Sequence, residues 1–127
     1  MTRRLISSGA PWEASAGYSR AVVSGDACSV SGTTDAGPDG RSRHPGDAGA
    51  QAVAALDIIE AALAEAGFAL TEVVRTRMFV TDPEAVGPVL AAHGARFGTI
   101  RPASTIVVVA GLIEPSLLVE IEADARH

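Results

Sequence analysis

Positive charge is scarce in this sequence, and lysine is absent. The ten basic residues are all arginines, they stand against fifteen aspartates and glutamates, and the formal net charge is −5. Proteins that follow a nucleic-acid backbone gather basic residues on one surface. The sequence therefore argues against a nucleic-acid partner.

Cysteine and long apolar runs are also lacking. The single cysteine, Cys28, cannot form a disulfide within the chain, which fits a reducing compartment, and its strand-like context predicts a buried structural thiol. The N-terminus has no apolar signal core, and no apolar run approaches the roughly 18 residues of a membrane span. These absences predict a cytoplasmic protein that does not bind a membrane.

Histidines are too few and too scattered to predict a metal site. None of the three has a second histidine or a cysteine at the spacing of a zinc ligand set. One of them, His93, falls on the apolar side of a predicted helix. There it is either a hydrogen-bonded, half-buried histidine or a catalytic base.

What the sequence does contain is enough for one folded domain. It has 127 residues, of which 47% are hydrophobic and 20% charged, as is typical of a globular protein with a real core. There is no internal repeat, and the Gly- and Pro-rich stretch at residues 34–46 is a surface loop too short to link two domains. We expect a single domain over residues 1–127.

The first half of the chain predicts strands followed by a helix. Residues 18–33 read as two strands joined at Gly25–Asp26, and residues 3–7 are a candidate for one more strand. A helix is predicted from the N-cap Asp47 to about residue 66, ended by Gly67. Its apolar stripe consists of Ala52, Ala55, Leu56, Ile59, Leu63 and Ala66, while Gln51, Asp57 and Glu65 lie off it.

The second half predicts three strands and a helix. Residues 73–81 alternate as a strand does, with Val74, Thr76, Met78 and Val80 on one side and Val73, Arg75, Arg77 and Phe79 on the other. A helix over residues 82–98 begins at Asp82 and Pro83, Pro88 is expected to kink or restart it, and Val86, Leu90, His93 and Phe97 share its apolar stripe. Strands at residues 104–110 and 117–125 follow, the first carrying an apolar run typical of a buried strand.

Two helices with this many strands predict an α+β fold in which helices cover one face of a sheet. The other face combines Arg75, Arg77, Glu120 and Glu122 with apolar neighbours such as Phe79. A face that mixes apolar and charged groups is typical of a subunit interface.

Four segments resemble, in order, signature regions of the RidA/YjgF family, also called L-PSP endoribonucleases. They are APWEASAGYSRAVVSGDACSVSGTT, VVRTRMFVTD, RPAST and LLVEIEADA. No segment is distinctive alone, but the four together, in the same order, cover nearly the whole chain. On these residues the chain is identified as a member of that family.

The resemblance implies a chorismate-mutase-like fold, with a mixed six-stranded sheet and two helices on one face. It also implies a homotrimer whose sheets line a central barrel, with ligand clefts between the subunits. The best-known members hydrolyse reactive imines and enamines, such as 2-aminoacrylate, to 2-oxo acids and ammonia. They use no metal or organic cofactor. The expected partners are therefore those that the clefts and the trimer imply, a small molecule and further copies of the chain.

The resemblance places Tyr18, Gly32 and Glu120 in the cleft, with Glu120 as the catalytic residue that orients water. A partly buried carboxylate suits such proton transfer. The open alternatives are an ion pair between Glu120 and Arg75 or Arg77, and simple packing of Tyr18 at a strand start. Glu122 is interpreted as structural.

Ser104 stands where deaminating members carry an arginine that grips the substrate carboxylate. A guanidinium forms two charge-assisted hydrogen bonds to a carboxylate, whereas a serine hydroxyl offers one neutral bond. The resemblance therefore implies a substrate that differs from 2-aminoacrylate and depends less on a carboxylate.

Four more residues are candidates for the same cleft. Thr105 alternates with Ser104, so only one of the two faces the cleft, and the alignment favours Ser104; both are otherwise ordinary polar residues of a strand entry. The backbone N–H of Ile106 is expected to help hold the polar end of the ligand. Arg101 either replaces the lost guanidinium or is a solvated or interface residue, and Trp12 either covers an apolar ligand or fills a subunit seam.

The first functional hypothesis is therefore hydrolysis (deamination) of a small imine or enamine. The alternative is a non-catalytic trimer that binds or senses a small metabolite in the same clefts. The family's ribonuclease label is a third reading, against which the acidic charge argues.

Overall fold

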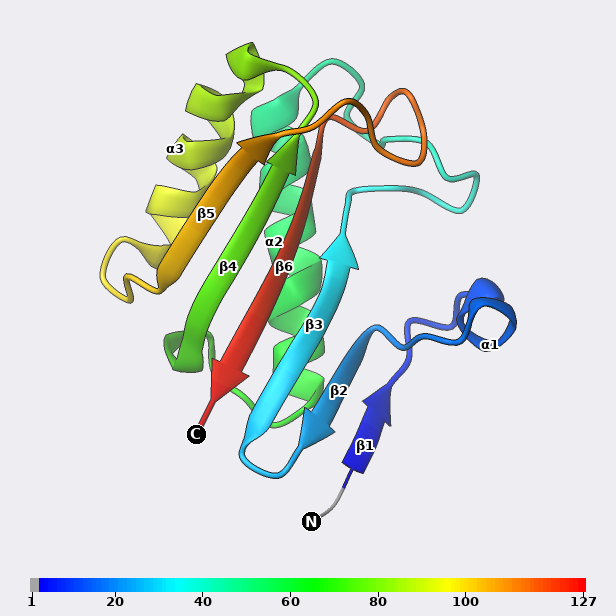
Figure 1. Ribbon diagram of the computed structural model, residues 1–127, viewed down its shortest axis with the longest axis vertical. Coiled ribbons are helices and arrows are strands. Elements are labelled where there is room, and N and C mark those ends of the chain that lie inside the picture. Colours follow the sequence, from blue (N-terminus) through cyan, green and yellow to red (C-terminus); the bar gives the residue numbers. More distant parts are fainter. Residues whose placement is uncertain (1–2) are drawn as a thin grey trace.

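The computed structural model describes residues 3–127, which form a sheet with a layer of helices on one face (Figure 1). The strands are β1 (Arg3–Ile6), β2 (Ala21–Ser24), β3 (Ala27–Thr33), β4 (Val73–Val80), β5 (Ala103–Val108) and β6 (Val119–Arg126). Their order in the sheet is β1-β2-β3-β6-β4-β5. Strands β4 and β5 run parallel and the other neighbours antiparallel, so the expected mixed six-stranded sheet is confirmed.

Two long helices, α2 (Ala48–Glu65) and α3 (Val86–Phe97), cover one face of the sheet, as expected (Figure 1). A short helix, α1 (Trp12–Ala16), lies beyond the ends of β1 and β2, where no helix was predicted. Two 3₁₀ turns, η1 (Leu70–Glu72) and η2 (Pro83–Ala85), precede β4 and α3. Within residues 3–127 no helix is long and apolar enough to cross a membrane.

Local chemistry sets the predicted element ends. Gly25 takes a φ of 61° in the β2–β3 turn, and Gly67 takes a φ of 86° after α2, a conformation that costs glycine little. The Asp47 side chain accepts a hydrogen bond from the Ala50 N–H (3.0 Å), which caps α2. The thiol of Cys28 is buried, as expected.

The apolar stripe of α2 packs on the sheet, but Gln51 does not lie outside the core as its polarity predicted. Gln51 is fully buried. Its amide nitrogen donates to the carbonyls of His44 (3.1 Å) and Ser116 (3.0 Å), and its oxygen accepts from the Leu118 N–H (2.8 Å). Full hydrogen bonding offsets the cost of burying the amide, so this side chain joins two loops under α2.

The predicted alternation of β4 is wrong at its first residues. Val73 is buried and Val74 exposed, the reverse of the prediction. The register against β6 shifts between Val73 and Arg75, and such an irregularity reverses the side on which the preceding residues lie. From Thr76 onward the predicted alternation is confirmed.

Helix α3 begins at Val86, after the 3₁₀ turn Pro83–Ala85, so the chain restarts a helix near Pro88 rather than kinking a longer one. The predicted stripe residue Leu90 is exposed, and Val89 is buried in its place. Both positions satisfy a helical spacing to Val86 and His93, and the packing on the sheet selects Val89.

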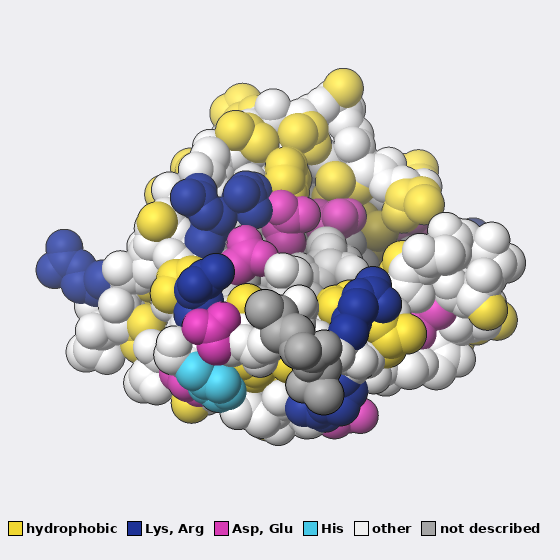
Figure 2. Space-filling model, turned by 60° about the horizontal axis from the view of Figure 1, so that its bottom comes forward, with side chains coloured by type: hydrophobic (Ala, Val, Ile, Leu, Met, Phe, Trp, Pro, Cys, Tyr) yellow, Lys and Arg dark blue, Asp and Glu magenta, His cyan; other side chains and the backbone are white. Residues whose placement is uncertain are grey.

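The face of the sheet away from the helices mixes charged and apolar side chains, as predicted. Arg77 forms ion pairs with Glu122 (3.3 Å) and Asp124 (3.4 Å) across the β4–β6 ladder. Figure 2, which brings the lower edge of the molecule forward, shows basic and acidic side chains next to one another with hydrophobic ones beyond them. We call the face of the sheet away from the helices, which carries Arg77, Glu122 and Asp124, the open face.

Strand β5 is one of the two edge strands of the sheet. The sequence predicted a buried strand here, but in the single chain Val107 and Val108 are 41% and 50% exposed. The prediction fails because the apolar run has a neighbouring strand, β4, on one side only.

Candidate functional site

Glu120 lies on the open face, in β6, opposite Phe79 of β4. Beside it the register of β3 against β6 shifts between Val30 and Thr33, and Gly32 lies in that irregular stretch. A Cβ atom on Gly32 would come within 2.1 Å of Glu120 Oε2. Gly32 thus leaves the room that the Glu120 carboxyl group occupies.

The surroundings of Glu120 favour its protonated form. Desolvation by burial raises the pKa of Glu120, and the neighbouring charge of Glu122 raises it further, while the guanidinium of Arg20 opposes both. A carboxyl group whose pKa moves toward neutrality can both give and take a proton. The ion pair expected as the alternative is not formed: among residues 3–127, Arg77 pairs with Glu122 and Asp124 instead.

Arg20 also belongs to the surroundings of Glu120, although it was not among the candidates predicted from the sequence. Its Nη2 donates to the carbonyl oxygens of Ser31 (2.7 Å) and Gly32 (2.8 Å). Its Nε is buried and has no partner among the described residues, and burial lowers the pKa of Arg20. The available signal was its position immediately before β2, two residues after the candidate Tyr18.

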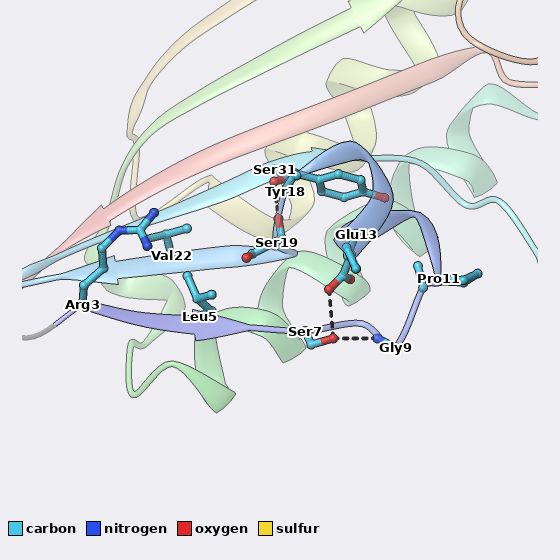
Figure 3. A pocket seen from close by; sticks show the side chains of 13 residues that line it. Arg3, Leu5, Ser7, Gly9, Pro11, Glu13, Tyr18, Ser19, Val22 and Ser31 are labelled. Carbon is cyan, nitrogen blue, oxygen red and sulfur yellow. Dashed lines mark hydrogen bonds between the residues drawn. The ribbon is translucent and has the colours of Figure 1, made fainter.

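Tyr18 lines a groove of about 780 Å³ formed by β1, α1 and the start of β2. Figure 3 shows Tyr18 with Arg3, Glu13 and Ser31 around this groove. The Glu13 carboxylate accepts hydrogen bonds from Ser7 Oγ (2.9 Å) and the Ser8 N–H (2.8 Å), which fixes the chain that passes under α1. These bonds lower the pKa of Glu13, with Ser8 as the main cause.

Trp12 does not line this groove. It is the first residue of α1 and is 50% exposed. The single chain therefore does not bring Trp12 together with Glu120. Whether it covers a ligand or a subunit seam stays a prediction.

Ser104 lies on the other side of the sheet, facing the helices. Its Oγ is 2.8 Å from Thr76 Oγ1, which is itself 2.8 Å from His93 Nε2 on α3. Thr76 is fully buried, whereas Ser104 is exposed and His93 half-buried. Burial lowers the pKa of His93, which favours the neutral imidazole. His93 is thus hydrogen-bonded and half-buried, the first of the two predicted alternatives.

The neighbours of Ser104 divide between the two faces. Thr105 lies opposite Arg77 on the open face, so within one chain Thr105, not Ser104, shares a face with Glu120. Ile106 packs against the core. Arg101 is exposed and has a φ of 59°, a left-handed conformation that costs a non-glycine residue about 1 kcal/mol. Its N–H closes the end of α3 on the Phe97 carbonyl (2.8 Å).

Five of the predicted candidates, Tyr18, Gly32, Glu120, His93 and Ser104, gather in two groups in one chain. Tyr18, Arg20, Gly32 and Glu120 form the first, here called the Glu120 cluster; Thr76, His93 and Ser104 form the second, called the Ser104 cluster. Neither cluster resembles a metal site: in the described chain no three His, Cys, Asp or Glu side chains are placed to hold an ion.

The comparisons with known proteins identify the family. The family model described as endoribonuclease L-PSP matches residues 8–127, which contain both clusters. The chain belongs to the L-PSP (YjgF/Rid) family. Protein SCO2049 of Streptomyces coelicolor is 38% identical over 122 residues, which span 96% of this chain and 90% of that protein.

Solved structures of L-PSP family members share the fold. Rv2704 of Mycobacterium tuberculosis, a YjgF/YER057c/UK114 family member, is 46% identical with a TM-score of 0.89, covering 99% of this chain and 100% of that one. The Rid family protein YyfA of Yersinia pestis is 29% identical, with a TM-score of 0.85 and coverage of 99% and 100%. The yjgF gene product of E. coli is 30% identical, with a TM-score of 0.78 and coverage of 97% and 93%.

Proposed function

We propose that this L-PSP family protein hydrolyses a small reactive imine or enamine, with Glu120 as its catalytic residue and without a cofactor. The observation that carries the proposal is the Glu120 carboxyl group, half-buried against Gly32, with a pKa raised by burial and by Glu122. Such a group can protonate an enamine carbon and can orient a water molecule at the resulting imine carbon.

The reaction balances without an oxidant or a metal. In an enamine, Glu120 gives its proton to the carbon and an iminium ion forms. Water then adds to the C=N carbon of this ion while the Glu120 carboxylate takes a proton from the water, which gives a neutral carbinolamine. The hydroxyl proton of the carbinolamine then passes to the nitrogen, the C–N bond breaks, the nitrogen leaves as ammonia and the carbon becomes a carbonyl. Tyr18 and the backbone held by Arg20 at Gly32 border this step.

The cleft itself is proposed to lie between subunits of a homotrimer, whose open faces line a central barrel in the chorismate-mutase-like manner. Two features support this. The open face carries both ion pairs and apolar side chains, and the two clusters lie on opposite faces of the sheet within one chain. A cleft that uses both clusters takes the Glu120 cluster from one copy and the Ser104 cluster from another.

The specificity is proposed to differ from that of 2-aminoacrylate hydrolases. Ser104 offers one neutral hydroxyl where an arginine would offer a bidentate cation, which lowers affinity for a carboxylate. The free energy lost is on the order of a few kcal/mol, because two charged hydrogen bonds are replaced by one neutral bond.

The test is turnover of imines that an amino-acid oxidase generates in situ, with 2-oxo acid and ammonia release followed for the wild type and Glu120→Gln. Faster release than in the enzyme-free reaction, abolished in Glu120→Gln, supports the proposal. Binding of a small 2-oxo compound with no acceleration for any imine would instead favour the alternative, a non-catalytic metabolite-binding or sensing trimer.

Complementation tests whether the cleft is shared. Glu120→Ala and Ser104→Trp each disable one half of it, and the exposed position of Ser104 tolerates a bulky residue without disturbing the core. If each cleft takes its halves from two copies, mixed assemblies regain about a quarter of the wild-type activity, because chance gives about one cleft in four two intact halves. No regain after unfolding and refolding the mixture would contradict a shared cleft.

A further inference from the structure

We propose that Ser104, Thr76 and His93 form a hydrogen-bond relay that recognises a neutral polar group of the ligand, such as an amide or ketone oxygen. The inference deepens the proposed function and rests on it, because it takes Ser104 to face the ligand cleft. It assigns work to His93 and Thr76 as positioning residues, which act on the ligand through the Ser104 hydroxyl.

The geometry is a continuous chain of three polar side chains. His93 Nε2, Thr76 Oγ1 and Ser104 Oγ are joined by two contacts of 2.8 Å each. The chain runs from α3 through the fully buried Thr76 of β4 to the exposed Ser104 of β5. Its middle, at Thr76, is closed from solvent, its end at His93 is half-buried, and its end at Ser104 presents an exposed hydroxyl.

The buried threonine couples the two ends. A hydroxyl has one proton to donate, so Thr76 either accepts from His93 and donates to Ser104, or accepts from Ser104 and donates to His93. In the first case Ser104 has its own O–H free to donate to a ligand. In the second case the Ser104 O–H donates to Thr76, so Ser104 can only accept a hydrogen bond from a ligand.

The tautomer of a neutral imidazole selects between these states. With the proton on Nε2, His93 donates into the relay and Ser104 donates to the ligand; with the proton on Nδ1, the direction reverses. Both states satisfy every hydroxyl, so the relay can adapt to a ligand acceptor or a ligand donor.

No charged side chain of the described residues takes part in the relay. Burial lowers the pKa of His93, and none of the ion pairs among the described residues includes its ring. The arginine on the same helix, Arg96, donates to Asp57 of α2 (2.7 Å) and is not directed at His93. Phe97, with its ring centroid 4.7 Å from that of His93, packs against the imidazole.

A neutral relay favours a neutral ligand group. A carboxylate brought against Ser104 gains one hydrogen bond but gives up hydration without a cation held in the cluster to replace it. A ketone or amide oxygen gains the same bond at a lower desolvation cost. The expected substrates therefore carry an amide, ester or ketone oxygen where 2-aminoacrylate carries its carboxylate.

The test compares pyruvamide with pyruvate, which have the same skeleton and differ in the charge of one group. Titration followed by NMR reads out the backbone amides of residues 104–106 and the ring nitrogens of His93. Pyruvamide is expected to bind more tightly than pyruvate. Its affinity should fall about fivefold in Ser104→Ala, the value of one neutral hydrogen bond, and measurably but less in Thr76→Val, which keeps the Ser104 hydroxyl but removes the partner that orients it.

Matched variants separate the relay from structural effects. Ser104→Thr keeps the hydroxyl and should keep pyruvamide binding, while Thr99→Val, an exposed threonine outside the relay, should change neither affinity nor the His93 signals. Thr76→Val should also shift the His93 ring nitrogens, because it removes their hydroxyl partner.

Equal affinities for pyruvamide and pyruvate would overturn the relay. So would Thr76→Val and Ser104→Ala variants that bind pyruvamide as tightly as the wild type does. The relay and the proposed function fail separately. Imine turnover without relay-dependent binding would overturn the relay alone. Relay-dependent binding without turnover of any imine would support the relay and overturn the hydrolase.

Discussion

Substitution of Gly32 by alanine is expected to remove activity while leaving the fold intact. The φ of Gly32 does not lie in the left-handed region, so its backbone accepts an alanine. The added Cβ would lie 2.1 Å from Glu120 Oε2, 3.0 Å from its Cδ and 3.3 Å from its Cγ. The conflict therefore concentrates on the carboxyl group of one side chain.

The size of the effect follows from that distance. Ordinary contact begins near 3.4 Å, so the Glu120 oxygen must move by about 1.3 Å. A glutamate can do this by rotating its end, at a cost of about 1 kcal/mol for an unfavourable torsion. A misplacement of about 1 Å costs on the order of a hundredfold in rate. We therefore expect a large loss of activity for a small loss of stability.

Two measurements and one control test this reasoning. Urea denaturation gives the free energy of unfolding, and imine turnover gives the rate, each for the wild type and Gly32→Ala. Gly87→Ala is the control, because nothing lies within 4 Å of the added Cβ and its helical position should gain up to about 1 kcal/mol. Full activity of Gly32→Ala, or failure of this variant to fold, would refute the reasoning.

Three further predictions concern pH, a buried amide and the thiol. Burial and Glu122 raise the pKa of Glu120 above its ordinary 4.5, so the contribution of this group to stability is present below pH 4.5 and is lost as the pH rises through the raised value. Glu120→Gln should therefore raise the melting temperature at pH 8. A difference in melting temperature between variant and wild type that grows toward pH 4 would contradict this. Gln51→Leu should lower the free energy of unfolding by about 2–3 kcal/mol in urea titrations, because it leaves two carbonyls and an N–H without partners; an unchanged midpoint would show that water replaces the amide. Cys28 is 1% exposed and burial raises the pKa of its thiol, so a disulfide reagent should modify it in urea but not in the native protein, and rapid native modification would show local opening.

The spacing of apolar residues was sufficient to predict the two long helices and the strands, because the apolar side chains of each of these elements pack against one neighbouring layer. The apolar stripe of α2 is confirmed, since this helix packs on a single partner surface. The alternation of β4 failed at Val73 and Val74 because the register irregularity depends on how β4 pairs with β6, about 50 residues away in sequence. Pairing between distant strands leaves no mark in the alternation of either strand.

The candidate site was predictable only where resemblance supplied the positions. Gln51 and Arg20 show the limit. A buried amide and a buried guanidinium look like surface residues in a sequence, and only the carbonyls that converge on them in the fold make their burial favourable. Ser104 was singled out for the arginine it replaces, whereas its link through Thr76 to His93 joins residues from three separate elements.

The alternation of side chains also bears on how many copies a complete site needs. Glu120 lies opposite Phe79 on the open face, and Ser104 lies opposite Thr76 on the helix side, so no rotation of either side chain brings the two polar groups together in one chain. If both act on one ligand, a second copy must place its edge strand β5 beside the first copy's open face. Val107 and Val108 of β5 are exposed apolar residues, so covering this strand with a second copy would remove apolar surface from water, which is favourable. Catalysis would then depend on association: dilution that separates the copies would abolish turnover while each folded chain keeps its Glu120 and Ser104 clusters unchanged.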